Sequence, residues 1–448
     1  MTAIRYAVVD PANGREVAAY ETASDQQVLD GVTRAQTAFT TWARVVDVAE
    51  RAALVRRVAE LHVERRQDLA ETMNREMGKP VAEALWEVDF SATIYTYYAD
   101  NAETFLAEEP IPLLQGEGTA VLRREPLGVL LGIMPWNYPI YQVARFAAPN
   151  LATGNTIVLK HAPQCPDSAT ALEAIFRDAG FPEGAYVNVF ASNEQVEMVI
   201  ADPRVQGVSL TGSERAGSAV AEIAGRHLKK VVLELGGSDP VIVLSTDDLD
   251  ATVEAASAAR LGNMGQACNA GKRVIVHESL YDDFVPKYTE RMLSAPSAPL
   301  SSEAAAVRLE QQVADAVQGG ASLAGGGERS GAWYRPGVLT SVVPGNEASH
   351  EELFGPVAMV FKARDEDEAI AIANDTPYGL GSYVFTTDPQ QADRVAKRID
   401  AGMVVVNGIG GIGAELPFGG VKRSGVGREL GRLGMEEFVN KKMVRTFR

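Results

Sequence analysis

The spacing of apolar residues separates a helical first part of the chain from a longer part in which strands and helices alternate. Between residues 25 and 107, apolar side chains recur every three or four positions among charged ones, as in "RAALVRRVAELHVERRQDLAETMNREMG" at 51–78. This period is that of an amphipathic helix, and "GKP" at 78–80 interrupts it. We therefore expect mostly helices over residues 25–107.

After residue 126 the pattern changes to short β-rich runs, each followed by a helical pattern. A first group of predicted strands lies at 155–160, 185–191, 207–210 and 229–235. A second group follows "SDPVIVL" and lies at 273–278, 355–363, 382–387 and 402–408. Strands that alternate with helices form parallel sheets through right-handed crossovers, so the sequence predicts an α/β fold with two units. The segments 294–306 and 323–333 are expected to be loops or linkers.

The composition is that of an ordinary globular protein and narrows the choice of partners. Of 448 residues, 46% are hydrophobic and 23% are charged, and the formal net charge is −17. This sign argues against nucleic acid or an anionic membrane as a partner. The chain has two cysteines, no signal-peptide pattern and no apolar run near the ~20 residues of a membrane span, so we expect a cytoplasmic enzyme. Its length suggests two or three domains.

Cys268 is the first candidate for chemistry. It lies in "GNMGQACNAGKR" (262–273), among glycines and polar side chains rather than in an apolar run. Such a cysteine is either a packed thiol or a reactive thiolate, and the stretch alone leaves both open. A cysteine hydrolase would pair the thiol with a histidine, but neither His161 nor His227 lies in a motif that marks a base. Cys165, in the loop or helix entry "PQCP", is expected to be dispensable.

Two stretches are candidates for a phosphate site. "GIGGIG" (408–413) matches the glycine pattern of a dinucleotide-binding turn, but no helix follows it, so we expect a flexible loop that lines a pocket. In "SLTGSERAG" (209–217) a strand leads into a helix whose first N–H groups, with the Ser213 hydroxyl, would favour a phosphate. A plain helix cap at Ser213 fits the same residues. Lys160 ends a predicted strand, at the sheet edge where ligands bind.

Two further polar residues stand out in apolar surroundings. Glu234, in "VLELGG", is costly to desolvate unless it is paired, which fits a general base with a raised pKa or a structural salt bridge. Asn137, in "MPWNYP", has a side-chain amide that can stabilise an oxyanion, or it is an ordinary turn asparagine. Together with a thiol and a phosphate-binding unit, these residues suggest thiohemiacetal chemistry with hydride transfer.

Seven motifs, taken in order, resemble those of the aldehyde dehydrogenase superfamily over essentially the whole chain. They are "MPWNYP", "VLK", "SLTGSERAG", "LELGGSDP", "GQAC", "EELFGPV" and "PFGGVKRSGVGRE". The resemblance implies a Rossmann-like cofactor domain, a catalytic α/β domain and a small β extension. It also implies oxidation of an aldehyde to a carboxylic acid with a nicotinamide cofactor, through a cysteine thiohemiacetal and a thioester.

The same resemblance assigns roles to individual residues, and it implies no metal site. The catalytic residues would be Cys268 as the nucleophile, Glu234 as the general base, and Asn137, which forms the oxyanion hole with the Cys268 backbone N–H. The cofactor would be bound by Lys160 at the adenosine ribose, Ser213 at the pyrophosphate, Glu352 and Phe354 at the nicotinamide ribose and ring, with Gly212, Trp136 and Gly236 beside them.

Cofactor preference is expected to lean toward NADP over NAD. Relatives that prefer NAD carry a glutamate three residues after the ribose-binding lysine, where this chain has Pro163. Without that carboxylate a 2′-phosphate is not repelled, and Lys160 offers it an attractive charge.

Within the superfamily, the chain is most similar to short-type bacterial succinate-semialdehyde dehydrogenases. Arg145, in "NYPIYQVARF", matches an arginine of those enzymes and would bind the distal carboxylate of succinic semialdehyde. If a helix opens at Pro139, the side chains on its substrate face are Tyr138, Tyr141, Gln142 and Arg145. The chain departs from the family pattern in a shortened 294–312 segment, in Gly262 and in the glycine-rich 408–413 loop, and these departures put the substrate rather than the reaction in doubt.

The resemblance also predicts the domain organisation. Residues 1–107 and 126–236 would form the cofactor domain, 237–429 the catalytic domain, and 108–125 with 430–448 an oligomerisation extension. An exposed edge strand needs a partner, so a homodimer or homotetramer is expected. Three alternatives stay open at this point: a dehydrogenase for another aliphatic or aromatic aldehyde, a thiol hydrolase or acyltransferase, and a non-catalytic nucleotide-binding protein.

Overall fold

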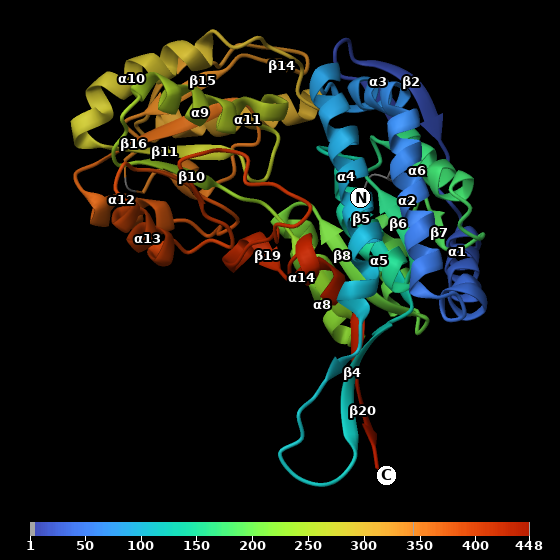
Figure 1. Ribbon diagram of the computed structural model, residues 1–448. Coiled ribbons are helices and arrows are strands. Elements are labelled where there is room, and N and C mark those ends of the chain that lie inside the picture. The colour runs from blue at the N-terminus through green and yellow to red at the C-terminus, as the bar shows by residue number, and fades with distance from the viewer. Residues whose placement is uncertain (1–4, 344, 448) are drawn as a thin grey trace.

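Two α/β units and a projecting β-sheet make up the protein (Figure 1). The structure is a computed structural model that describes residues 5–343 and 345–447. The first unit begins with a hairpin of β1 (Tyr6–Asp10) and β2 (Arg15–Tyr20). Its helices are α1 (Asp25–Ala38), α2 (Val48–Glu64), α3 (Arg66–Met77), α4 (Val81–Leu106), α5 (Tyr141–Thr153), α6 (Pro166–Asp178), α7 (Asn193–Ala201) and α8 (Glu214–Arg226). The helical character expected for residues 25–107 is confirmed.

The sheet of the first unit has the strand order β19-β9-β8-β5-β6-β7 among the described residues. Its strands are β5 (Val129–Met134), β6 (Thr156–His161), β7 (Tyr186–Asn188), β8 (Val205–Thr211), β9 (Lys230–Glu234) and β19 (Gly425–Val426). All neighbours pair in parallel except β19, which runs antiparallel to β9. Strand β5 was not among the predicted strands, because its continuous apolar run lacks the alternation of a half-buried strand.

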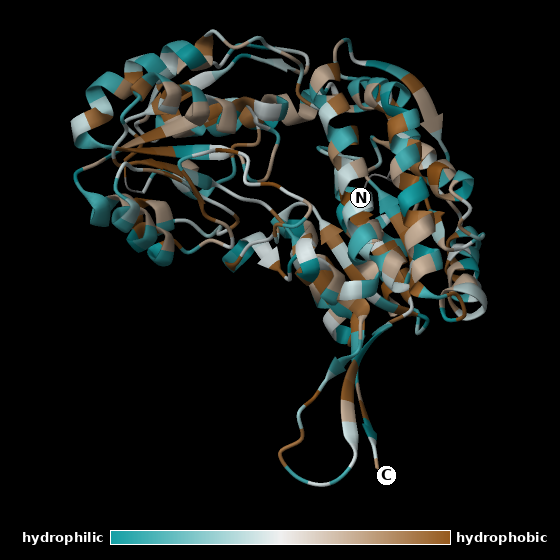
Figure 2. Cartoon of the chain, viewed as in Figure 1, coloured by the Kyte–Doolittle hydropathy of each residue, from teal (hydrophilic) through white to brown (hydrophobic). Residues whose placement is uncertain are grey.

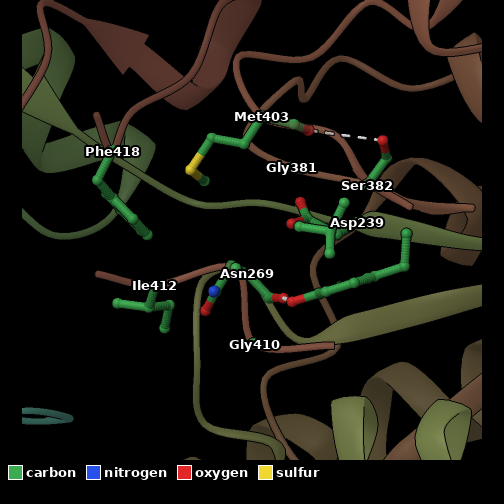
Figure 3. Close-up of a pocket in the computed structure, with 11 residues that line it drawn as sticks. Asp239, Asn269, Gly381, Ser382, Met403, Gly410, Ile412 and Phe418 are labelled. Carbon is green, nitrogen blue, oxygen red and sulfur yellow. Dashed lines mark hydrogen bonds between the residues drawn. The ribbon is translucent and has the colours of Figure 1, made fainter. Parts of the chain in front are cut away.

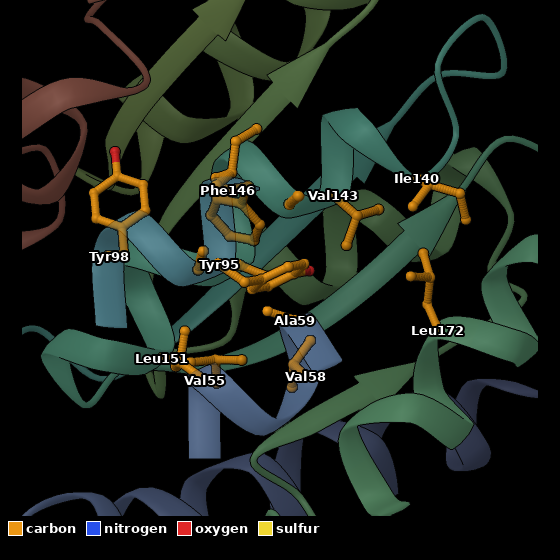
Figure 4. Packing of buried hydrophobic residues seen from close by; sticks show 14 of the residues in the cluster. Val55, Val58, Ala59, Tyr95, Tyr98, Ile140, Val143, Phe146, Leu151 and Leu172 are labelled. Carbon is orange, nitrogen blue, oxygen red and sulfur yellow. The ribbon is translucent and has the colours of Figure 1, made fainter. Parts of the chain in front are cut away.

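Helices α2, α4 and α5 pack face to face and form the largest core of the first unit (Figure 4). Val55 and Val58 of α2, Tyr95 of α4, and Val143 and Phe146 of α5 are all buried there. This packing fixes α5 against α4, so the first turn of α5 is held rigidly.

The second unit is built on a sheet with the order β12-β15-β16-β11-β10-β17-β18 in the described part of the chain. Its strands are β10 (Asp239–Val243), β11 (Gly271–His277), β12 (Ser322–Gly325), β15 (Gly337–Thr340), β16 (Val357–Ala363), β17 (Tyr383–Phe385) and β18 (Val405–Val406). The helices are α9 (Leu249–Leu261), α10 (Glu278–Leu293), α11 (Glu303–Gln318), α12 (Glu366–Asn374) and α13 (Pro389–Arg398). In both units the strands are largely hydrophobic, whereas the outer helices carry many polar residues (Figure 2).

Two segments predicted as loops contain regular structure. Helix α11 begins inside 294–306, because the Ser302 side chain accepts from the Ala305 N–H and caps it. The segment 323–333 contains most of β12, which pairs antiparallel with β15, and the hairpin strands β13 (Arg329–Ser330) and β14 (Trp333–Tyr334). Both segments are rich in Ser, Gly and Ala, which show no periodic spacing of apolar residues, so the hydrophobic pattern did not indicate this helix and these strands.

A narrow sheet of β3 (Glu109–Pro110), β4 (Thr119–Pro126) and β20 (Val439–Thr446) projects from the first unit (Figure 1). Strand β20 pairs antiparallel with the whole length of β4. The boundaries near residue 430 differ from those expected. Strand β19 joins the first sheet, and α14 (Gly431–Glu436) packs on α5, so the chain returns to the first unit before it enters the projecting sheet.

None of the helices in the described ranges combines the length and the apolar character that a membrane span requires.

Candidate active site

Asn137 and the loop of Cys268 meet between the two units. Asn137 follows β5 at the carboxyl end of the first sheet, and Cys268 lies in the loop that leads into β11 of the second. The Asn137 Nδ2 donates to the carbonyl of Gln266, at 3.0 Å, two residues before the cysteine. A primary amide has two N–H donors, so one remains for a substrate oxygen. The structure thus brings the predicted oxyanion donor and the predicted nucleophile together.

The surroundings of Cys268 favour the protonated thiol over the thiolate. Burial raises its pKa to about 12, while the nearby charges of Arg145 and Lys272 act in the opposite direction. The Lys272 Nζ donates to the backbone carbonyl of Cys268 at 2.7 Å and to that of Ala267 at 2.8 Å. The backbone of the nucleophile is therefore held by a buried ammonium group. Activation of the thiol requires that a base take its proton.

The histidines considered as partners of Cys268 are committed elsewhere or exposed. His161 accepts from the Ala162 N–H through Nδ1, and its Nε2 lies 2.9 Å from the carbonyl of Pro139. The Nε2 therefore carries the proton, and burial lowers the pKa of this imidazole to about 4. His227 is exposed at the end of α8. The cysteine–histidine hydrolase reading thus finds no base in either of these residues.

Glu234 ends β9 and is buried, with 2% of its surface exposed. Neither of its carboxyl oxygens has a hydrogen-bond partner among the residues that the structure describes. Burial, together with the charge of Glu429, raises its pKa well above the ordinary value, and Arg145 lowers it. No ion pair involves Glu234 within the described ranges, so the structural salt bridge considered for it is not found. An unpaired buried carboxyl group of raised pKa suits a general base.

Arg145, on α5, is fully buried and forms an ion pair with Glu429. Its Nε lies 2.7 Å from the Glu429 Oε2, and its Nη1 donates to the Tyr141 hydroxyl at 3.4 Å. The guanidinium also stacks over the rings of Tyr141 and Phe418, at 4.8 and 4.4 Å from their centroids. Its Nη2 has no hydrogen-bond partner in the described part of the chain. The Nη2 group of this buried cation is therefore left for a ligand.

The other predicted substrate residues lie in the first turn of α5 and in the segment just before it. Helix α5 begins at Tyr141, two residues later than expected, so Tyr138 precedes the helix; its carbonyl accepts from the Gln142 N–H, at 3.0 Å. Tyr138 lies under the Lys79 ammonium, with 3.7 Å between Nζ and the ring centroid. Gln142 is buried, and its Oε1 has no partner among the described residues.

A small hollow, open to solvent, lies beside the nucleophile loop (Figure 3). Asn269, the residue after Cys268, lines it together with Ile412 and Phe418. Gly410 and Gly411 are also among the lining residues, so the glycine-rich loop lines this pocket, as expected.

On the cofactor side, Lys160 and Ser213 stand at the carboxyl edge of the first sheet. Lys160 is the next-to-last residue of the buried strand β6 and has no salt bridge to any described residue, and burial lowers its pKa to about 8. Ser213 caps α8 by accepting from the Ala216 N–H, at 3.3 Å, which leaves its hydroxyl hydrogen for a phosphate. The N–H of Gly212 donates to the Glu234 carbonyl at 2.9 Å, so this N–H is not available to a ligand.

Between the units, Glu352 and Phe354 face residues of the first unit. Glu352 accepts from the Gly237 N–H at 3.1 Å and lies 3.2 Å from the Lys272 Nζ. A Cβ on Gly236 would lie 2.6 Å from a Glu352 carboxylate oxygen, so any larger residue there would push the Glu352 carboxylate aside. Phe354 meets Trp136 edge to face, with 5.6 Å between centroids. These contacts join the two halves of the predicted nicotinamide site.

Sequence reasoning missed three charged residues that shape the site. Lys272 lies only four residues after Cys268 in a stretch that was already singled out, and Glu429 ends the last quoted motif. Their proximity to predicted residues was a signal that could have been used. Lys79, by contrast, reaches the Asn137 carbonyl from outside every quoted motif, at 2.7 Å, and the linear sequence gives no sign of it.

Comparison with known proteins agrees with this geometry. The model of the aldehyde dehydrogenase family matches residues 2–444. The chain is 52% identical over 455 residues to the succinate-semialdehyde dehydrogenase [NADP(+)] of Deinococcus radiodurans, covering 99% of this chain and 95% of that one. It is 43% identical over 452 residues to succinate-semialdehyde dehydrogenase [NADP(+)] 1 of Mycobacterium tuberculosis, covering 98% and 99%.

Solved structures extend the likeness to the fold. The crystal structure of succinic semialdehyde dehydrogenase from Streptococcus pyogenes in complex with NADP+ aligns with a TM-score of 0.95 at 38% identity, covering 99% of this chain and all of that one. The resemblance read from seven short motifs is therefore confirmed over the whole fold. On sequence and structure alike, the chain belongs to the aldehyde dehydrogenase family.

Proposed function

We propose that this protein oxidises succinic semialdehyde to succinate with NADP as the electron acceptor. The observation that supports this substrate is the buried Arg145 guanidinium. Its Nη2 has no hydrogen-bond partner among the described residues, and its charge lies close enough to Cys268 to lower the thiol pKa. A distal carboxylate bound there would place the aldehyde end of a short chain near the sulfur. Relatives at 52% and 43% identity are named for the same substrate and cofactor.

The chemistry follows from the residues at the junction of the units. The Cys268 thiol first loses its proton to solvent, and the resulting thiolate attacks the aldehyde carbon. The oxygen that becomes an anion accepts from the Asn137 amide and the Cys268 backbone N–H. When bound, the nicotinamide supplies a hydride acceptor, and loss of hydride leaves a thioester on Cys268. Glu234 then takes a proton from water, which attacks the thioester and releases the carboxylate and the thiol.

The residues present fit an anionic dinucleotide. Lys160 is a buried cation with no described counter-charge, Ser213 offers a hydroxyl at the start of α8, and Pro163 removes the carboxylate that would oppose a 2′-phosphate. Glu352 would hold the nicotinamide ribose, and Phe354 and Trp136 the ring. Lys160 and Ser213 thus provide the charge and the donor that a phosphorylated cofactor needs.

We also propose that the protein works as a homodimer or homotetramer. In the single chain, β20 is an outer strand of the projecting sheet, with exposed residues such as Met443 along it. A second subunit that pairs with this edge would satisfy its free backbone groups. Light scattering that gives a monomer at micromolar concentration would contradict this.

Steady-state kinetics test the proposed function. Succinic semialdehyde, butanal and benzaldehyde are compared with NADP and with NAD by the absorbance of the reduced nicotinamide. We expect kcat/KM for succinic semialdehyde with NADP to exceed that for either neutral aldehyde at least tenfold, and KM to be lower for NADP than for NAD. Equal rates on all three aldehydes would favour a general aldehyde dehydrogenase, and no reduction of the cofactor would favour a thiol hydrolase.

A further inference from the structure

Three charged side chains at the start of α4 hold the two loops that carry the proposed catalytic residues. They are Lys79, just before the helix, and Glu83 and Glu87, one turn apart on it. Helix α4 lies at the side of the first unit that faces the second (Figure 1). We refer to these three residues as the α4 clamp.

Glu87 and Lys79 fix the segment that contains Asn137. The Glu87 Oε1 accepts from the backbone N–H groups of Ile140 and Tyr141, at 2.9 and 3.0 Å. Ile140 cannot cap α5 with its own side chain, so a carboxylate from another helix satisfies these donors and the positive helix end. The Lys79 Nζ pairs with Glu87 and donates to the Asn137 carbonyl at 2.7 Å. Both ends of the segment 137–141 are thereby held by one buried ion pair.

Glu83 holds the loop of the nucleophile from the same helix face. It accepts from the backbone N–H of Asn263 at 2.6 Å, across the junction of the units. Asn263 has a left-handed backbone, with φ of 51°, and its Nδ2 donates to the Asn137 carbonyl at 2.9 Å. The Asn137 Nδ2 in turn donates to Gln266. The contacts therefore form a closed path from α4 to the Cys268 loop, to Asn137 and back to α4.

We propose that Lys79, Glu83 and Glu87 are positioning residues for the oxyanion hole. They set the Asn137 amide, from the first unit, at its distance from the Cys268 backbone N–H, from the second. The two donors stabilise an oxyanion only if their spacing is held to within about half an ångström, and neither sheet alone fixes it. The inference rests on the proposed function for the role of Asn137, but not on the identity of the aldehyde.

The main test replaces Glu83, which is only partly buried, so that the fold is retained. Glu83→Ala removes the acceptor for Asn263, Glu83→Gln keeps one, and Glu103→Ala changes an exposed acid on the same helix as a control. The readouts are kcat and KM for aldehyde oxidation, hydrolysis of p-nitrophenyl acetate without cofactor, the Kd for NADP, and the rate at which iodoacetamide alkylates Cys268.

We expect Glu83→Ala to lower kcat for oxidation and for ester hydrolysis at least tenfold, because both reactions form an oxyanion at the same place. The KM, the Kd for NADP and the alkylation rate stay within about threefold, since none of them needs the oxyanion hole. Glu83→Gln recovers kcat to within threefold of the wild type, and Glu103→Ala matches it. Unchanged kcat in Glu83→Ala, or a parallel loss in alkylation and cofactor binding, would overturn the proposal.

A second pair of variants separates positioning from charge burial. Glu87→Gln alone leaves the Lys79 ammonium buried without its counter-charge and is expected to destabilise the fold. The double variant Lys79→Met/Glu87→Gln keeps an acceptor for the α5 N–H groups and loses the Lys79 contacts with the Asn137 carbonyl and the Tyr138 ring. We expect it to keep the melting temperature to within a few degrees and to lose at least tenfold in kcat. A wild-type kcat in this stable double variant would overturn the role of Lys79. If the wild type hydrolyses the ester but oxidises no succinic semialdehyde, the substrate proposal fails, and the clamp is judged on ester hydrolysis.

Discussion

Replacing Arg145 with methionine tests how this protein selects an acidic aldehyde. The structure commits two of the three guanidinium nitrogens, Nε to Glu429 and Nη1 to Tyr141, and leaves Nη2. A substrate carboxylate then gains one charge-assisted contact, a net contribution of about 1.5–3 kcal/mol. Because Glu429 already shares the charge, we take the lower part of this range, about 1.5–2 kcal/mol. At about 1.36 kcal/mol for each factor of ten, this is roughly a 10- to 30-fold loss in kcat/KM.

The assay compares succinic semialdehyde with butanal, which has the same chain length and no carboxylate. Arg145→Met is expected to lower kcat/KM for succinic semialdehyde by roughly 10- to 30-fold and that for butanal less than twofold. The double variant Arg145→Met/Glu429→Gln controls for the carboxylate that the single change leaves without its partner. Equal losses on both aldehydes in both variants would show that Arg145 supports the fold, and the proposed substrate would fall with it.

The stability of the same variant has a pH dependence whose sign can be worked out. Burial raises the pKa of both Glu234 and Glu429, and Arg145 opposes that rise. When folding raises the pKa of a carboxyl group, the group contributes fully to stability below its pKa in the unfolded chain, about 4.3. This contribution is lost as the pH rises through the pKa in the folded protein. Without Arg145 the pKa values of Glu234 and Glu429 in the folded protein rise further. The melting temperature of Arg145→Met should therefore approach that of the wild type near about pH 5 and fall behind it toward about pH 8.

Three further predictions concern the chemistry. Cys268→Ala should abolish oxidation while the Kd for NADP stays within about twofold, and Cys165→Ala should remain active; turnover in the first variant would disprove the nucleophile. Glu234→Gln should show a burst of reduced cofactor followed by slow turnover, because the thioester forms but water lacks a base; equal loss of both phases would give Glu234 another role. The Kd for NADP should rise as pH increases through about 8, by at most tenfold per pH unit, because Lys160 loses its proton there; Lys160→Met should lose this slope, and an unchanged slope would exclude the lysine.

The sequence predicted the chemistry of this protein better than the arrangement that supports it. Strands such as β6 and β8 and the residues at their ends were predictable, because apolar runs bounded by Gly, Lys or Thr mark the carboxyl edge of a parallel sheet. Strand β19 was not predictable, since its two residues, Gly425 and Val426, carry no pattern, and its pairing with β9 is decided by the tertiary fold. The partner of Arg145 was missed for a related reason, because Glu429 lies 284 positions away in the chain.

What the sequence did not reveal is chiefly the set of contacts that fixes the two units relative to each other. Each sheet fixes the ends of its own strands, so Asn137 and Glu234 are placed by the first unit and Cys268 by the second. Their relative position depends on contacts across the junction, such as Glu83 with Asn263 and the edge-to-face rings of Trp136 and Phe354. A motif can contain such residues, but the sequence does not show which of them meet across the junction. These contacts nevertheless decide whether the thiol, the amide and the carboxyl group act on one substrate atom, because a misplacement of about 1 Å can cost about a hundredfold in rate.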